Sequence, residues 1–221
     1  MTLRTILAFF LMLSSYSLFA QQDLGIEKQW VVKTSPLALF EPETIIIQGG
    51  LEYFFNTKVS IQSEIGLNGG LFGMKAGRGG NEDFRIWRSK SEVKFYTKKN
   101  YWAVEFFYVN KDFTRKDDSY GMDGQEFFYD KARINFYVLA TGIKFGRQVY
   151  TSKNILIDSF AGLGFRGRFR QISQVELSEN QSDEFSENFF DFADRYRFNG
   201  WDSVPHFTIG VKVGILTGDL D

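Results

Sequence analysis

The feature that most constrains the fold is a set of long segments in which apolar and polar residues alternate. In residues 58–68, one face carries the apolar side chains of Val59, Ile61, Ile65 and Leu67. Residues 206–216 repeat the pattern, and one face there carries Phe207, Ile209, Val211, Val213 and Ile215. A helix would place apolar residues three and four positions apart, so a period of two predicts β-strands in both segments.

Eight such segments are predicted along the chain. They are residues 30–40, 44–55, 58–68, 85–97, 101–110, 132–146, 154–170 and 206–216. In residues 132–146 the alternation changes phase midway, which predicts a β-bulge or a misplaced strand end. Strands of soluble domains usually have about five or six residues, whereas a tilted membrane strand needs about 9–11. The length of the segments therefore favours strands that cross a membrane.

Apart from the first connection, a short corner at residues 41–43, the connections between these segments alternate in length. Residues 56–57, 98–100 and 150–153 are short and rich in Asn, Thr, Lys and Ser, which predicts tight hairpin turns. Three other connections are long: residues 69–84 are Gly-rich, residues 111–131 are charged, and residues 171–202 are strongly acidic. Brief periplasmic turns and long external loops are typical of transmembrane barrels. The predicted fold class is therefore all-β, an eight-stranded antiparallel up-and-down transmembrane β-barrel.

The N-terminal residues predict the compartment. Arg4 precedes an apolar run over residues 6–13, and small residues then lead to Ala20, as in a cleavable secretory signal. The run is much shorter than the roughly 20 residues that a spanning helix needs. We therefore divide the chain into a signal peptide, residues 1–20, and an outer-membrane β-barrel domain, residues 21–221, and expect it in the outer membrane of a Gram-negative cell.

The polar faces of the segments predict the contents of the lumen. An eight-stranded barrel has an interior that side chains can fill. With the apolar faces turned to lipid, the lumen receives charges of both signs, at Lys33, Glu52, Glu64, Glu92, Lys94, Glu105, Lys144, Arg166, Arg168 and Lys212. Buried charges persist only when they are paired and hydrogen-bonded, so we expect a salt-bridged lumen without an open pore.

Two further residue types support this arrangement. Glycines on the same inward face would make room for long Arg and Lys side chains, and they are Gly50, Gly66, Gly142, Gly162, Gly164, Gly210 and Gly214. Aromatic residues near the strand ends predict girdles at the membrane interfaces. The candidates are Trp30, Tyr53, Phe55, Tyr101, Trp102 and Tyr108.

Composition narrows the classes of function. Net charge is −1, with 26 basic and 27 acidic residues, so no global field points to a nucleic-acid partner. The chain has no cysteine, which excludes disulfides and cysteine-based metal sites. We expect no cofactor and no metal centre. The acidic segment 171–202 is a candidate for binding an extracellular partner or a divalent cation, and outer-membrane lipid should surround a monomeric barrel.

Two alternatives stay open. If the apolar faces point inward, the chain is a soluble periplasmic or secreted lipocalin-like barrel that binds an apolar ligand. The other alternative is a lipid A-modifying barrel enzyme that uses His206, the one histidine, beside Thr208 on the polar face of the last segment. A nucleophile needs a base within hydrogen-bond reach and a third group that orients it. The sequence names no such set, so we do not expect an enzyme.

Several stretches resemble a known group of proteins. Residues 33–37 (KTSPL), 49–53 (GGLEY) and 160–165 (FAGLGF) are similar to stretches of small outer-membrane β-barrels of Bacteroidota. These proteins are grouped loosely as OmpA- or OmpW-like barrel domains, and many have no assigned function. The resemblance implies the barrel fold over the whole mature chain. It implies a structural or interaction role through the external loops and names no activity.

Overall fold

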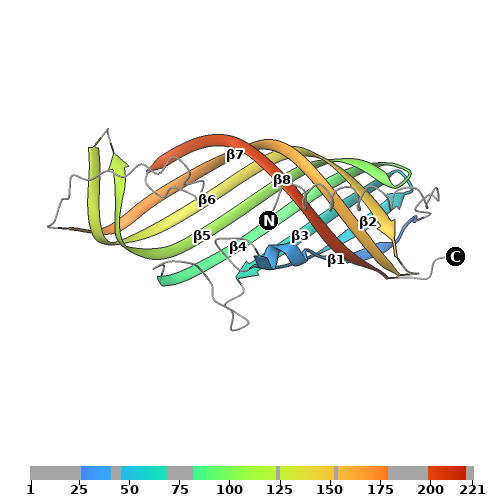
Figure 1. Ribbon diagram of the computed structural model, residues 1–221, viewed down its shortest axis with the longest axis horizontal. Helices are drawn as coiled ribbons and strands as arrows, with labels where there is room; N and C mark the ends of the chain where they lie inside the picture. The colour runs from blue at the N-terminus through green and yellow to red at the C-terminus, as the bar shows by residue number, and fades with distance from the viewer. Residues whose placement is uncertain are drawn as a thin grey trace, which may run out of the picture.

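The computed structural model describes residues 26–40, 46–68, 82–122, 125–151, 154–178 and 199–217. Eight antiparallel strands follow one another around a closed barrel (Figure 1). They are β1 (Trp30–Thr34), β2 (Ile46–Asn56), β3 (Val59–Asn68), β4 (Glu82–Thr97), β5 (Asn100–Met122), β6 (Gln125–Tyr150), β7 (Ile155–Leu177) and β8 (Gly200–Thr217). The predicted all-β, eight-stranded antiparallel barrel is confirmed.

Pairing between neighbouring strands closes the barrel with a stagger. Following paired residues from Lys33 around all eight strands leads to Val204 on β8. Lys33 itself pairs with Gly214 on β8, so the difference between positions 204 and 214 gives a shear of ten residues. For eight strands this shear corresponds to a tilt of about 40–45°, which is usual for barrels. Tilted strands of this kind leave an interior that side chains can fill.

The first predicted strand, residues 30–40, is wrong in its second half. β1 ends at Thr34, and a short 3-10 helix, η2 (Pro36–Phe40), follows. Pro36 has no backbone N–H to donate to a strand ladder, and its fixed φ suits the first turn of a helix. At the end of β1, two groups donate hydrogen bonds to the backbone carbonyl oxygen of Gln48 on β2. They are Thr34 Oγ1, at 2.9 Å, and the Ser35 backbone N–H, at 3.2 Å. In the described part of the chain, no helix is long and apolar enough to cross a bilayer.

The predicted loop over residues 111–131 is wrong as well. β5 and β6 continue as a hairpin in one register from the pair Asn100↔Arg147 to the pair Met122↔Gln125. Figure 1 shows this hairpin, together with the end of β7, reaching past the remaining strands at the end of the barrel away from the short turns. Charged residues cover much of it, which explains why its composition resembles that of a loop.

The other two long connections lie partly outside the described residues. Residues 171–177 extend β7 and residues 200–202 begin β8, so the predicted loop 171–202 is wrong at both ends. Its middle, residues 179–198, lies outside the described part. The same holds for residues 69–81 of the predicted loop 69–84, and for the predicted signal peptide.

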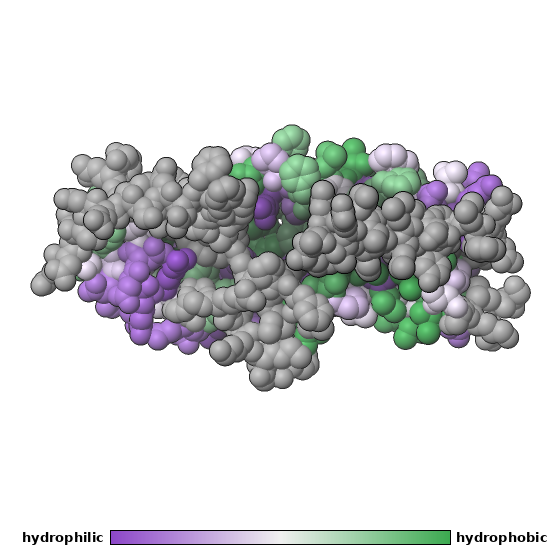
Figure 2. All heavy atoms as spheres, in the orientation of Figure 1, coloured by the Kyte–Doolittle hydropathy of each residue, from purple (hydrophilic) through white to green (hydrophobic). Residues whose placement is uncertain are grey.

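Burial is inverted relative to a soluble barrel. Large apolar side chains on the outer face are exposed, from 38% for Val211 to 79% for Phe207, while lysine and glutamate side chains fill the interior. Figure 2 shows hydrophobic residues along the wall and hydrophilic ones near the end that carries the β5–β6 hairpin. A lipocalin-like barrel needs the opposite orientation, so this structure favours a barrel whose wall faces lipid.

Aromatic side chains form two bands on the outer face. Near the short turns, ring centroids lie 4.7 Å apart for Trp30–Tyr53, 5.1 Å for Tyr53–Phe55 and 5.2 Å for Trp102–Phe145. Toward the other end they lie 5.1 Å apart for Trp87–Tyr108 and 5.2 Å for Phe169–Trp201. Two such bands are typical of the interfaces of a membrane barrel. Tyr101 is an exception among the predicted girdle residues, because it occupies the inward face of β5 and is buried in the lumen.

Candidate functional site

A layer of lysines and carboxylates fills the middle of the lumen, and we call it the central layer. All eight strands contribute to it, and every member is at most 2% exposed. Its members are Lys33, Glu52, Glu64, Glu92, Lys94, Glu105, Lys144, Asp158 and Lys212. Eight of these nine residues are among the ten lumen residues named from the sequence.

The carboxylate of Asp158 on β7 has four hydrogen-bond donors. It accepts hydrogen bonds from Lys33 Nζ at 2.7 Å and from Lys94 Nζ at 2.9 Å. The hydroxyl of Tyr101 donates to it at 2.7 Å, and Gln148 Nε2 donates at 3.2 Å. Two charged and two neutral donors therefore surround one carboxylate, which is how a buried charge is stabilised.

Glu52 lies beside this group and shares its lysines. Lys33 forms an ion pair with Glu52, and Lys94 Nζ lies 3.3 Å from Glu52 Oε1. The same carboxylate accepts hydrogen bonds from Ser60 Oγ at 2.5 Å and from Tyr96 Oη at 2.6 Å. The two carboxylates and two lysines thus form one connected cluster.

A second cluster continues the layer across the lumen. Glu92 accepts hydrogen bonds from Lys144 Nζ and Lys212 Nζ, each at 2.8 Å. Lys144 also pairs with Glu105, and Lys212 pairs with Glu64. Each of these lysines therefore bridges two carboxylates. The layer as a whole holds five carboxylates and four lysines, so its charge is almost balanced.

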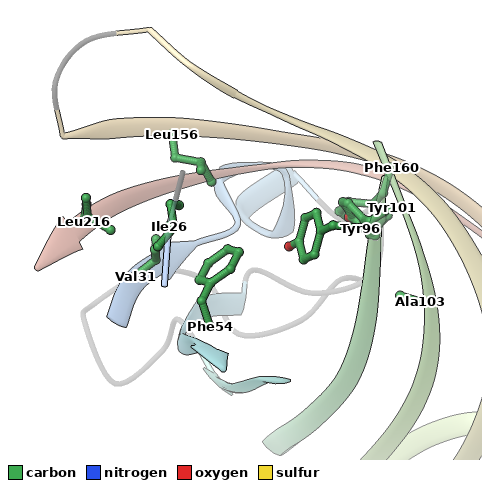
Figure 3. Close-up of a cluster of buried hydrophobic side chains, with 9 residues drawn as sticks. All are labelled: Ile26, Val31, Phe54, Tyr96, Tyr101, Ala103, Leu156, Phe160 and Leu216. Carbon is green, nitrogen blue, oxygen red and sulfur yellow. The ribbon is translucent and has the colours of Figure 1, made fainter. Parts of the chain in front are cut away.

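An apolar cluster, the lower cluster, closes the lumen on the side of the short turns. Figure 3 shows its side chains pointing toward the interior. They come from six of the strands and from the segment before β1. Its buried members are Ile26, Val31, Phe54, Tyr96, Tyr101, Ala103, Leu156, Phe160 and Leu216. The hydroxyls of Tyr96 and Tyr101 reach the carboxylates of the central layer, so the two groups share a boundary.

A second apolar cluster, the upper cluster, lies on the side of the β5–β6 hairpin. It contains Ile46, Ile86, Val109, Phe113, Ile134, Phe136 and Val138. The predicted bulge in residues 132–146 is wrong, because from Arg133 onward β6 keeps one register with β5 and with β7. The apparent change of phase arises because β6 places apolar side chains in the lumen here and on the outer face farther along.

Glycines leave space for the long side chains of the lumen. A Cβ at Gly162 would lie 2.7 Å from Lys144 Cγ, and a Cβ at Gly66 would lie 2.7 Å from Arg88 Cγ. Both distances are far shorter than real Cβ contacts, so any larger residue would displace the lysine or the arginine. The geometry agrees with the role expected of inward-facing glycines.

The structure places the last two predicted lumen residues, Arg166 and Arg168, outside the central layer. Both lie on the inward face of β7 nearer the hairpin end, and both are half-buried. Arg168 donates two hydrogen bonds to Asp202, from Nε at 2.9 Å and from Nη2 at 2.5 Å. These arginines therefore belong to a separate region, which we call the upper lumen.

Several members of the lumen network were not predicted. Asp158 shares the inward face of β7 with Phe160, whose apolar character hid that this is the polar side of the strand. Gln62 accepts a hydrogen bond from Lys94 Nζ at 2.6 Å and is buried like the charged residues. On one strand, residues an even number of positions away from a predicted lumen charge also face inward. Applying this rule to each strand would have identified both residues.

His206 has no constellation of catalytic groups around it among the described residues. Its ring stacks on Phe107, with centroids 6.1 Å apart and planes 5° from parallel. Thr208 lies on the same inward face of β8, and both residues are half-buried. In the described part of the chain no hydrogen bond joins His206 to Thr208 or to a carboxylate, so the geometry favours no lipid A-modifying triad.

Comparison with known proteins gives one sequence family and one weak structural likeness. The family described as "Protein of unknown function (DUF3575)" matches residues 6–201. A crystal structure of Acinetobacter baumannii CarO is 16% identical, and the alignment covers 86% of this chain and 97% of that chain with a TM-score of 0.35. A superposition as loose as this carries no conclusion about function. No curated protein matches the chain.

Proposed function

Because the chain belongs to the family described as "Protein of unknown function (DUF3575)", whose description assigns no activity, we propose a function from the geometry of the barrel. We propose that the protein is a monomeric, non-conducting barrel of a Gram-negative outer membrane. It serves as a structural or interaction protein through its extracellular end. The proposal includes two expectations from the sequence. The chain is related to small outer-membrane barrels of Bacteroidota, and residues 1–20 are removed as a signal peptide.

The observation that carries the proposal is the filled lumen. Charged side chains of the central layer meet in ion pairs across the whole cross-section, and an apolar cluster lies on each side. An ion that crossed the barrel would have to displace buried, paired charges and pass two apolar clusters, which costs far more than thermal energy. Diffusion through the lumen is therefore blocked.

The interaction role is supported by the β5–β6 hairpin. Its outer part carries ion pairs, such as Lys116 with Glu82 at 2.8 Å and Arg133 with Asp112 at 2.7 Å. Stacked aromatic rings of Tyr120 and Phe127, with centroids 5.5 Å apart, stiffen it farther out. A rigid hairpin that stands in water presents a defined surface to an extracellular partner. The acidic segment 171–202 is a second candidate for contact with a partner or a divalent cation.

We expect the purified protein to give no stable unitary conductance steps in a planar lipid bilayer, because the lumen is closed. A general porin inserted under the same conditions is the positive control. Protease protection in vesicles checks that the purified protein has inserted into the bilayer. Reproducible single-channel steps from the wild-type barrel would contradict a closed lumen.

The interaction role is tested by photo-crosslinking on intact cells. A photoreactive residue replaces Lys116 on the hairpin, and a matched variant carries it at Ile143 on the outer wall of β6. We expect protein or polysaccharide adducts from position 116 and only lipid adducts from position 143. Equal adduct patterns from both positions, or none from position 116, would count against a role of the hairpin in binding.

A further inference from the structure

Three lysines lie together at the end of the barrel that carries the short turns, and we call them the turn-end patch. Lys58 lies in the turn between β2 and β3, and Lys98 and Lys99 form the turn between β4 and β5. The two turns are neighbours, because the Tyr96 backbone N–H donates to the Lys58 carbonyl oxygen at 2.8 Å. Both lie at the end of the barrel away from the tip of the β5–β6 hairpin (Figure 1).

The β4–β5 turn carries two lysines where other residues are more usual. Thr97 pairs with Asn100, so Lys98 and Lys99 are the two central residues of a tight hairpin. Lys98 has a φ of 59°, a left-handed conformation that Asn and Gly adopt more readily. Lys99 is 8% exposed, which limits the positions that its side chain can take. The turn therefore holds two positive charges in a defined place.

The ammonium groups of the turn-end patch have no counter-charge in the described part of the chain. No ion pair or side-chain hydrogen bond joins them to another described residue. Outside the central layer, the ion pairs of the described ranges all lie toward the hairpin end, as for Lys116 with Glu82. Glu27, the one exposed carboxylate described near the short turns, pairs with none of the three lysines. The patch therefore favours an anion from outside the protein.

An exposed aromatic side chain lies three positions along the chain from each of these lysines. Phe55 precedes Lys58, Phe95 precedes Lys98, and Trp102 follows Lys99. The three aromatic side chains are 51%, 52% and 59% exposed, respectively, and Phe95 pairs directly with Trp102 across β4 and β5. Each lysine thus stands just beyond the aromatic band that lies near the short turns.

The spacing between the aromatic rings and the lysines matches the thickness of a lipid headgroup layer. Aromatic girdles mark the edges of the apolar band of a membrane barrel. Three strand residues span about 10 Å, which a strand tilt of about 40–45° converts to about 7 Å along the membrane normal. The headgroup region on each side of a bilayer is about 5–7 Å thick. The lysines therefore reach the level of the lipid phosphates.

We propose that the turn-end patch binds the phosphates of anionic phospholipids in the leaflet around the short turns. Lys58, Lys98 and Lys99 donate charge-assisted hydrogen bonds to phosphate oxygens, while Phe95 and Trp102 contact the upper part of the acyl chains. A zwitterionic lipid carries its own cation and gains less from the unpaired lysines. This inference rests on the proposed position of the barrel, with its outer wall in lipid, and needs no partner at the hairpin.

Quenching of tryptophan fluorescence in vesicles tests the patch. The substitutions Trp30→Phe, Trp87→Phe and Trp201→Phe leave Trp102 as the one tryptophan of the chain. Vesicles of dioleoylphosphatidylcholine contain either phosphatidylglycerol or phosphatidylcholine with a nitroxide on the upper acyl chain, at the same mole fraction. We expect labelled phosphatidylglycerol to be enriched at least about threefold near Trp102, and about 0.5 M sodium chloride to remove this preference by screening. Equal quenching by both lipids at low salt would overturn the proposal.

Charge removal assigns the preference to the patch. In the same single-tryptophan background, the triple variant Lys58→Gln/Lys98→Gln/Lys99→Gln keeps side chains of similar length without their charges. We expect labelled phosphatidylglycerol to quench its Trp102 no more strongly than labelled phosphatidylcholine does. A triple variant that folds and keeps the full preference would overturn the assignment to these lysines.

The matched control removes three positive charges from the hairpin side. Lys116, Lys131 and Arg133 are exposed there, and each is replaced with Gln. This control should keep the wild-type preference for phosphatidylglycerol at Trp102, because its charges lie at the other end of the barrel. Loss of the preference in the control would show that net charge alone attracts the lipid, and would overturn the proposal of a local site.

The gel-mobility shift on boiling separates this inference from the proposed function. A barrel that inserts into phosphatidylcholine vesicles, shows the shift and yet has no preference for phosphatidylglycerol contradicts the patch alone. A chain that inserts into neither type of vesicle contradicts the membrane barrel itself, and the lipid patch with it.

Discussion

Replacing Asp158 with alanine is expected to lower the free energy of unfolding by about 3–5 kcal/mol, the usual cost of removing one partner from a buried ion pair. Lys33 and Lys94 both direct their ammonium groups at this carboxylate, at 2.7 and 2.9 Å. Without it, two buried lysines lie close together, with Glu52 as their main counter-charge. The measurement is reversible unfolding in urea from lipid vesicles, followed by tryptophan fluorescence.

The matched control for Asp158 is Asp112→Ala on β5. Asp112 also accepts two hydrogen bonds from one cation, because Arg133 donates to it from Nε at 3.0 Å and from Nη2 at 2.7 Å. That pair stands on the outer face of the hairpin side, where solvent weakens the attraction between the charges. The control should therefore unfold close to the wild-type midpoint. If both variants lose the same stability, the central layer does not have the buried, paired character assigned to it.

Replacing Ile143 with arginine is the second change with a large expected effect. Ile143 is 55% exposed on the outer face of β6, between the Phe145 and Tyr137 aromatic positions, and its strand neighbours Val104 and Leu163 face outward too. An arginine on the lipid face near the middle of the membrane costs about 2–4 kcal/mol. On a face that met water, the same arginine would cost little.

The substitution Ile143→Leu is the control, because it keeps an apolar side chain of similar size at the same place. Folding efficiency into vesicles and the urea midpoint are compared for the two variants. We expect Ile143→Arg to fold poorly and to unfold at lower urea, and Ile143→Leu to match the wild type. An arginine variant that folds and unfolds like the leucine variant would contradict a lipid-facing outer wall.

Alternation along the strands predicted which face of each strand points inward, because the side-chain period of a strand is fixed at two. That rule alone leaves open whether the apolar face meets lipid or a ligand, and segment length favoured lipid. The ten predicted lumen residues were chosen by this rule, and eight of them meet in the central layer. Their partners across the barrel depend on strand order and shear, which alternation does not encode.

Other features escaped prediction for physical reasons. The lumen is apolar above and below the charges, so Phe136 or Phe160 on an inward face resembles a lipid-facing residue. The outer part of the β5–β6 hairpin, beyond Tyr129, pairs with no other described strand, so both of its faces can be polar and alternation disappears. Pro36 sets the end of β1 at Thr34. This signal is present in the sequence, but the apolar residues after Pro36 favoured a longer predicted strand.

The central claim is that this chain forms a closed barrel inserted in the outer membrane, with its charges inside and its apolar residues in lipid. The most direct test is membrane fractionation and unboiled-gel mobility after expression with the native N-terminus in a Gram-negative host. We predict recovery in the outer-membrane fraction and a band whose mobility shifts on boiling, as expected for a detergent-resistant barrel. Recovery as a soluble periplasmic protein without a heat-dependent shift would contradict the account.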